Sequence, residues 1–233
     1  SLHIQRGPVV LAVGRLVPKK GFDVLLRAWA GWLDDHGFLS PDQAETTDNL
    51  GSADAGHPQS RSTRQDSGPI CVMMGDGPEA DALRTLANQL RIGDFVRFTG
   101  AANQEQVRTA MRGCDVFALP GQPASDGDRD GIPVVLMEAM ACGRPVIGGD
   151  LPAIRELLTA NSGARRVEPG NKVMLCEALG ELLGNSKVRA TAGRHGRARV
   201  IEEFSADVNL DRLEQAFANV SQGSELGGDS HHG

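Results

Sequence analysis

The stretch Asp126-Gly-Asp-Arg-Asp-Gly-Ile-Pro-Val-Val-Leu-Met-Glu-Ala-Met-Ala-Cys-Gly143 decides the fold that we expect for this chain. It follows an apolar strand that ends at Ala118-Leu119-Pro120, and it predicts an acidic, glycine-containing loop that leads into a buried helix. The first peptide N–H groups of a helix have no partners within the helix and lie at the positive end of its dipole. The junction is therefore expected to bind an anion, most commonly a diphosphate.

A carboxylate stands at each end of this turn, Asp130 before the helix and Glu138 one to two turns inside it. Glu138 is placed to accept hydrogen bonds from hydroxyl groups of the same ligand, such as those of a ribose. The stretch therefore predicts a nucleoside-diphosphate site in which the acids hold sugar hydroxyls and the peptide N–H groups hold phosphates.

Short apolar runs alternate with helical patterns along the rest of the chain. We expect strands at residues 8–13, 69–74, 95–98, 116–119, 145–147 and 166–167. Helices are expected at residues 21–32, from Pro78 to about 90, and at 104–112, 151–158, 172–183, 187–203 and 207–220. This alternation predicts an α/β fold with a single Rossmann-like, doubly wound parallel sheet. Ligands of such sheets bind at the carboxyl ends of the strands, and every motif described here lies in a loop at that edge.

The chain has 233 residues, enough for one domain with a sizeable core. We expect this domain to span residues 1–222, followed by a flexible tail at 223–233. Residues 40–68 are dominated by polar residues, Gly and Pro, with few large apolar side chains. Such a segment buries too little surface to offset the entropy of ordering it, so a mobile surface insertion is expected there.

The charge and cysteine content exclude several classes of protein. A formal net charge of -6 argues against a general nucleic-acid binder, which needs a basic face. No apolar run is long enough to span a membrane and no signal peptide opens the chain, so we expect a cytoplasmic protein. The four cysteines, at positions 71, 114, 142 and 176, show no metal-ligand spacing, and we expect reduced, buried thiols.

The first loop at the carboxyl edge, Gly14-Arg-Leu-Val-Pro-Lys-Lys-Gly21, carries two cations of interest, Arg15 and Lys20. Arginine offers a planar fork of donors to phosphate oxygens, and lysine offers a compact charge. Together they can neutralise a diphosphate without a metal ion, although a solvated surface loop has the same composition.

The residues at 126, 128 and 130 also satisfy the D-x-D pattern that chelates Mg²⁺ or Mn²⁺. Because the cations already supply positive charge, we expect no metal and no cofactor.

The second loop, Gly75-Asp-Gly-Pro-Glu-Ala80, matches the G-x-G-x-x-A form of the dinucleotide fingerprint. That fingerprint needs an acid at the end of the next strand, and here the strand ends in Thr99-Gly100. A dehydrogenase is therefore disfavoured. We expect Gly75 to let the backbone pass close to a nucleotide.

These motifs, in this order, resemble the carboxyl-terminal half of the family-4 retaining glycosyltransferases, which have the two-domain GT-B fold. The resemblance runs from about residue 8 to residue 204, apart from the insertion. Its carriers are Gly14-Arg15, Lys20-Gly21, Met74-Gly-Asp-Gly-Pro78, Val96-Arg-Phe-Thr-Gly100, Cys114-Asp-Val-Phe-Ala-Leu-Pro120 and the stretch from Gly131 to Gly143.

The resemblance implies roles for individual residues. In that family an E-x7-E pair brackets the central turn. Glu138 matches the second acid of this pair and would hold the ribose. The first acid is replaced by the shorter Asp130, which would contact the donor sugar. Arg15 and Lys20 match the residues that bind the diphosphate, beside Gly14. The backbone at Gly131, Ile132 and Val134 would face the phosphates, whereas Pro133 has no N–H to donate. The segment at Ala101-Ala102 would lie against the base.

The reaction implied by the resemblance is transfer of a hexosyl group from a UDP-, GDP- or ADP-sugar, with retention at the anomeric carbon. The acceptor would be a growing glycan or a lipid-linked sugar. In that family an amino-terminal domain binds the acceptor, so we expect this chain alone to bind nucleotide and transfer little. Peripheral attachment to the inner membrane through that domain stays open. The alternatives are a non-catalytic nucleotide-sugar-binding module and an epimerase of the same architecture.

Overall fold

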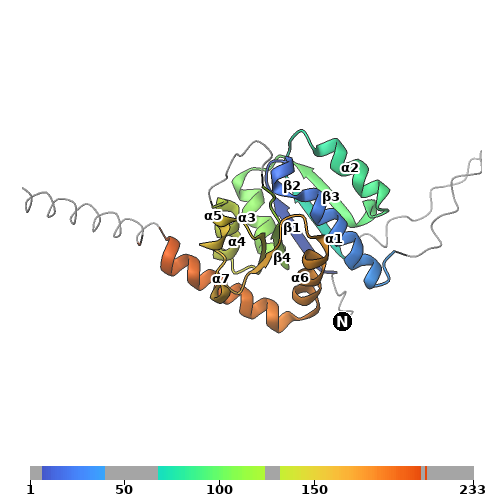
Figure 1. Ribbon diagram of the computed structural model, residues 1–233. Coiled ribbons are helices and arrows are strands. Elements are labelled where there is room, and N and C mark those ends of the chain that lie inside the picture. Colours follow the sequence, from blue (N-terminus) through green and yellow to red (C-terminus); the bar gives the residue numbers. More distant parts are fainter. Residues whose placement is uncertain (1–6, 40–67, 124–131, 206–207, 209–233) are drawn as a thin grey trace, which may run out of the picture.

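The computed structural model describes residues 7–39, 68–123, 132–205 and 208 (Figure 1). Six strands form one parallel sheet in the order β3-β2-β1-β4-β5-β6. The strands are β1 Val9–Val13, β2 Ile70–Met74, β3 Val96–Gly100, β4 Val116–Leu119, β5 Val146–Gly149 and β6 Arg165–Val167. Each expected strand is present at its expected place. The expected doubly wound parallel sheet is confirmed.

The order of the strands reverses between β1 and β4. The chain runs outward from β1 through β2 to β3, then returns to β4 and runs outward on the other side to β6. Val10 pairs with Val116 and Leu11 with Phe117 across this junction. In open α/β sheets, ligands bind in the crevice at the carboxyl ends of the strands where the order reverses. The loops after β1 and β4 therefore flank the place where a ligand is expected.

Helices cover both faces of the sheet (Figure 1). On one face α1 packs against α2 and α6, and on the other α4 packs against α7. The bounds are α1 Phe22–Asp35, α2 Ala80–Gln89, α3 Gln104–Gly113, α4 Val134–Ala141, α5 Pro152–Arg155, α6 Lys172–Gly184 and α7 Ser186–Phe204. The described residues also form the short 3₁₀ turns η1 Pro18–Lys20, η3 Gly93–Phe95 and η4 Ala160–Ser162. Asparagine side chains accept backbone N–H bonds at the starts of α3, α6 and α7.

The core lies between the central strands and the two helical layers. All four residues of β4 and of β5 are buried, as apolar strands with both faces covered should be. Trp29 of α1 is fully buried and donates its indole N–H to the carbonyl oxygen of Phe95 at 3.0 Å. Its ring stacks on Trp32 with the centroids 5.0 Å apart. These contacts fix α1 over the β1–β2–β3 side of the sheet.

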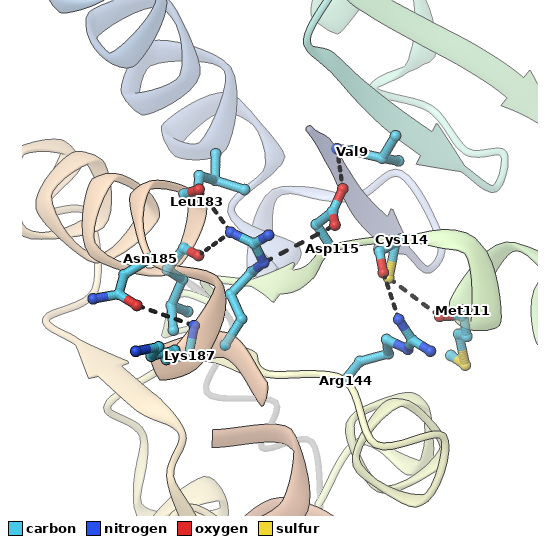
Figure 2. Close-up of polar contacts among 10 residues, drawn as sticks. Val9, Met111, Cys114, Asp115, Arg144, Leu183, Asn185 and Lys187 are labelled. Atoms are coloured by element: carbon cyan, nitrogen blue, oxygen red, sulfur yellow. Dashed lines mark hydrogen bonds and ion pairs between the residues drawn. The ribbon is translucent and has the colours of Figure 1, made fainter. Parts of the chain in front are cut away.

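The amino edge of the sheet carries a polar cluster that the sequence did not predict (Figure 2). Asp115 accepts the backbone N–H of Val9 at 2.9 Å and lies 4.0 Å from the guanidinium of Arg189. Arg189 also donates to the carbonyl oxygens of Leu182 and Leu183, at 3.0 and 2.7 Å. The end of α6 and the start of α7 are thereby tied to the amino ends of β1 and β4, opposite the expected ligand edge.

Some expectations differ from the structure. Pro78 does not open α2, which starts at Ala80, because residues 77–79 form a turn that bonds to the first loop. The helix expected at 151–158 is shorter and ends at Arg155. The cysteines are free thiols, as expected, but only Cys71 and Cys114 are buried. All but the last residue of the insertion expected at 40–68, most of the helix at 207–220 and the tail at 223–233 lie outside the described residues.

Candidate functional site

The loops after β1 and β4 are joined by main-chain hydrogen bonds at the carboxyl edge. The N–H of Gly121 donates to the carbonyl oxygen of Lys20 at 3.2 Å, and that of Gln122 donates to Lys19 at 2.8 Å. The side-chain amide of Gln122 also donates to Asp23 in the first turn of α1, at 3.0 Å. The structure therefore brings the basic first loop against the start of the acidic loop.

Lys20 lies beside the end of β1. It closes η1, and the next residue, Gly21, adopts the left-handed conformation (φ 69°) that turns the chain into α1. The Cδ and Cε atoms of Lys20 lie 4.0 Å from the position that a Cβ on Gly14 would take. The side chain therefore folds back over the strand end, toward the place where the sheet order reverses.

Arg15 is exposed, whereas the next residue, Leu16, is buried with 2% of its surface exposed. Leu16 anchors the loop, because its N–H donates to Asp76 at 2.9 Å and its carbonyl oxygen accepts from Glu79 at 3.0 Å. Sequence reasoning missed this residue. The available signal was a pair of apolar residues, Leu16 and Val17, in a loop that also carries three cations.

Because Gly75 has no side chain, the backbone of the first loop can approach it closely and fills the space beside it. A Cβ at this position would lie 1.9 Å from the carbonyl oxygen of Gly14. The N–H of Gly14 donates to Met74 at 3.0 Å, and the N–H of Gly75 donates to Gly100 at 2.9 Å. The loops after β1, β2 and β3 are thus held together through backbone atoms. Passage of a nucleotide close to Gly75 stays a prediction.

The segment after β3 completes this edge. Gly100 is in the left-handed region (φ 73°), Ala101 is exposed and Ala102 is half-buried against the core. Asn103 then caps α3 through a reciprocal pair of 2.9 Å bonds with Gln106. The two alanines expected to lie against the base are therefore accessible at the carboxyl edge.

On the other side of the reversal, α4 begins at Val134, and no side chain caps its start within the described residues. Ile132 and Pro133 are half-buried, and Val134 is 62% exposed. Glu138 is half-buried one turn inside the helix. The first peptide N–H groups of α4 are available to an anion. Asp130 and Gly131, and the aspartates of the D-x-D pattern, lie outside the described residues.

A third charged group lies at the end of β5. Asp150 accepts two hydrogen bonds from Arg155, at 3.0 and 3.1 Å, and lies 3.3 Å from Arg166. The hydrogen bonds from Arg155 hold the pKa of the Asp150 carboxyl below its ordinary value. Asp150 is therefore engaged with two arginines, whereas the Glu138 carboxylate has no hydrogen-bond or ion-pair partner among the described residues.

The arrangement suits an anionic ligand with hydroxyl groups. The loop that carries Arg15 and Lys20 lies on one side of the reversal, and the start of α4, with the positive end of its dipole, lies on the other. Glu138 supplies a carboxylate one turn deeper. Within the described residues no helix is both long and apolar enough to cross a membrane.

Comparison with known proteins identifies the family of this chain. The profile of the family described as "Glycosyl transferases group 1" matches residues 59–199. A GDP-mannose-dependent monoacylated alpha-(1-6)-phosphatidylinositol monomannoside mannosyltransferase of Corynebacterium glutamicum is 31% identical over 207 residues, which are 88% of this chain and 46% of that protein. The putative colanic acid biosynthesis glycosyltransferase WcaL of Salmonella typhimurium is 31% identical over 64% of this chain and 36% of its own length.

Solved structures share the fold at low sequence identity. Anabaena HepE in complex with UDP superposes with a TM-score of 0.68 and 20% identity, over 93% of this chain and 50% of that one. The C-terminal domain of the group 1 glycosyl transferase LpcC from Francisella tularensis gives 0.64 at 17% identity, over 87% of this chain and 89% of that one.

The chain spans less than half the length of the first two curated relatives, 46% and 36%. The fold matches the half of HepE that aligns with it, and matches the separate domain of LpcC over most of its length. The expected fold class, one Rossmann-like half of a GT-B architecture, is confirmed. By its profile match, its relatives and its fold, this chain belongs to the group 1 glycosyl transferases.

Proposed function

We propose that this chain is the donor-binding domain of a retaining glycosyltransferase. It would move a hexosyl group from a nucleoside-diphosphate sugar to an acceptor such as a growing glycan or a lipid. One observation carries the proposal: the loop with Arg15 and Lys20 and the loop that leads to α4 flank the reversal of strand order and bond to each other. Family membership supports it.

In this proposal each residue has a separate task. Arg15 and Lys20, beside Gly14, neutralise the diphosphate, and the peptide N–H groups at the start of α4 bind its oxygens. Glu138 accepts hydrogen bonds from the ribose, and Asp130 accepts them from the donor sugar. When the nucleoside diphosphate departs, the same cations stabilise its developing charge, where one preorganised donor can contribute about 3 kcal/mol. No metal is required for this charge balance.

The names of the relatives suggest which donor to test first. The mannosyltransferase of C. glutamicum is described as GDP-mannose-dependent, and HepE was solved with UDP. We therefore propose GDP-mannose as the first donor and a UDP-sugar as the second.

The binding test is calorimetry with GDP, UDP and ADP. Replacing Lys20 with Ala should weaken diphosphate binding about tenfold or more, the usual effect of losing a charge-assisted hydrogen bond. Arg15→Ala should act similarly. Arg112→Gln removes an equal charge at the end of α3, outside the proposed site, and serves as the control. Unchanged GDP and UDP affinity in both site variants would refute the assignment of the diphosphate to this loop.

The two acids should behave differently. Glu138→Gln should weaken GDP binding more than it weakens inorganic pyrophosphate binding, because only GDP carries a ribose. Asp130→Asn should weaken GDP-mannose binding and leave GDP affinity unchanged. The reverse pattern would overturn the division of tasks between the carboxylates.

The proposed activity needs a separate test. The chain alone should bind the donor and transfer little, and adding the amino-terminal half of a relative, in cis or in trans, should allow transfer to a mannosylated lipid acceptor. Donor binding that never yields transfer would favour a non-catalytic nucleotide-sugar-binding module. Isomerisation of a free nucleotide sugar without acceptor would favour an epimerase.

A further inference from the structure

Gln122, just after β4, holds the first loop through two separate hydrogen bonds. Its peptide N–H donates to the carbonyl oxygen of Lys19 in η1 at 2.8 Å. Its side-chain amide donates to the carboxylate of Asp23, in the first turn of α1, at 3.0 Å. The two acceptors lie on either side of Lys20 and Gly21 in the chain. One residue therefore spans the segment that carries Lys20.

The same segment is packed closely against the end of β4. The N–H of Gly121 donates to the carbonyl oxygen of Lys20 at 3.2 Å. A Cβ on Gly21 would lie 3.2 Å from the nitrogen of Gly121 and 3.4 Å from Cγ of Gln122. Gln122 and Asp23 are both half-buried, and a hydrogen bond from an amide to a carboxylate is stronger than one between neutral groups. The side-chain link is therefore a built contact between residues 99 positions apart in the chain.

The backbone that carries Lys20 has little support of its own. It ends η1, a single 3₁₀ turn, and such turns have poorer hydrogen-bond geometry than an α-helix. The chain then reverses direction at Gly21 before α1 begins. The side chain of Lys20 nevertheless has a definite place, because its Cδ and Cε atoms lie beside Gly14 at the end of β1. A shift of about 1 Å in a ligand-binding group can weaken its contact strongly, so the bonds from the β4 side matter for that place.

We propose that Gln122 is a positioning residue for Lys20, with Asp23 as the acceptor of its side-chain amide. This inference rests on the proposed function, because it requires Lys20 to bind the diphosphate of the donor. Gln122 acts through Lys20, so its amide should raise the affinity for a nucleoside diphosphate only while Lys20 is present. Neither Gln122 nor Asp23 is assigned a contact with the ligand.

The test is a double-mutant cycle, read by calorimetry with GDP at a temperature where circular dichroism shows every variant to be folded. Gln122→Met keeps an unbranched side chain of similar length beside Gly21 and removes only the amide. It should weaken GDP binding about threefold to tenfold, the usual size of a coupling between residues in contact. In a chain that already carries Lys20→Ala, the same substitution should cause no further loss. Gln89→Met removes an exposed amide from the last turn of α2 and serves as the matched control, with unchanged affinity.

A rescue experiment checks that the hydrogen bond itself is responsible. Gln122→Glu places a second carboxylate against Asp23 and should weaken GDP binding at least as much as Gln122→Met. Adding Asp23→Asn to Gln122→Glu restores the hydrogen bond with donor and acceptor exchanged, at the original net charge, and should recover most of the lost affinity. If only the charge of Asp23 mattered, Gln122→Met, which changes no charge, would leave GDP affinity unaltered.

The outcomes separate this inference from the proposed function. An unaltered chain that binds no GDP, or a Lys20→Ala chain that binds it equally well, would refute the assignment of the diphosphate to Lys20, and this inference with it. Weakened binding in Lys20→Ala beside unchanged binding in Gln122→Met would overturn the inference alone. So would a Gln122→Met loss of the same size with and without Lys20, because Gln122 would then not act through that side chain.

Discussion

Two glycines in α7, one turn apart, should respond in opposite directions to the same substitution. Gly193 and Gly196 are both buried in this helix. A Cβ on Gly193 would lie 2.1 Å from the carbonyl oxygen of Gly143, whereas a Cβ on Gly196 would lie 3.5 Å from its nearest neighbours, Met140 and the carbonyl oxygen of Ser162. The first contact is too short for any real Cβ atom, and the second is ordinary van der Waals contact.

The magnitudes follow from these distances. Alanine is better than glycine in a helix interior by about 1 kcal/mol, so Gly196→Ala should stabilise the protein by up to that amount. For Gly193→Ala the same gain is opposed by overpacking against a backbone carbonyl, which costs about 1 to 3 kcal/mol. Displacing α7 would also strain the hydrogen bond from Arg197 to the carbonyl oxygen of Ala141, which contributes about 1 kcal/mol. Gly193→Ala should therefore be destabilised by about 1 to 3 kcal/mol.

Urea unfolding followed by circular dichroism measures both free energies. The melting temperature should rise by about 2 to 4 °C for Gly196→Ala and fall by at least as much for Gly193→Ala, given about 2 to 4 °C per kcal/mol in a domain of this size. Because α7 packs on α4, Gly193→Ala should also weaken GDP binding through Glu138. A Gly193→Ala protein as stable as Gly196→Ala would show that α7 does not approach the Gly143 turn as closely as described.

Two further predictions concern titratable groups. Burial raises the pKa of the Cys71 and Cys114 thiols to about 12 in each case. Ellman's reagent at pH 8 should therefore label only Cys142 and Cys176 in the native protein, and all four cysteines after unfolding. Equal reaction rates for the four native thiols would contradict this burial. A hydrogen bond from Arg165 holds the pKa of Glu181 below its ordinary value of 4.5. A pKa that is lower in the folded state than in the unfolded state stabilises the protein above pH 4.5. This stabilisation is lost as the pH falls through the pKa of the folded state. Both side chains are partly exposed, so the loss of stability should be only about a few tenths of a kcal/mol. The urea midpoint of Arg165→Gln should therefore decline less steeply below pH 4.5 than that of the unaltered protein. An unchanged slope would show that the ion pair contributes nothing to stability.

The sequence predicted the sheet well because its strands are buried on both faces. Runs such as Val9–Val13 and Val116–Leu119 are continuously apolar, and only a covered parallel strand or a helix accommodates them. Helix starts were harder to place. Pro78 suggested the first residue of α2, but the backbone there bonds to Leu16 in a distant loop, and no local pattern encodes that contact.

The polar contacts between distant elements could not be predicted. Arg189 reaches Asp115 across 74 positions, and Arg84 lies over Phe98 because an edge strand passes beside α2. The position of the candidate site was predictable for a different reason: the carboxyl ends of parallel strands all lie on one edge, so Lys20 and the start of α4 had to share it. The tasks of the site residues stay predictions.

In the candidate site, main-chain atoms hold the loops together, whereas side chains are expected to bind the ligand. Its loops contact one another through main-chain atoms: Gly14 with Met74, Gly75 with Gly100, and Lys20 with Gly121. These bonds need glycines where backbones approach closely, as at Gly75, and place no demand on the side chains of Arg15 or Lys20. Replacing Arg15 should therefore change ligand affinity with little change in stability, whereas Gly75→Ala should lower both. This difference makes the binding tests interpretable, because a loss of affinity in Arg15→Ala at unchanged melting temperature reports on the ligand contact rather than on the fold.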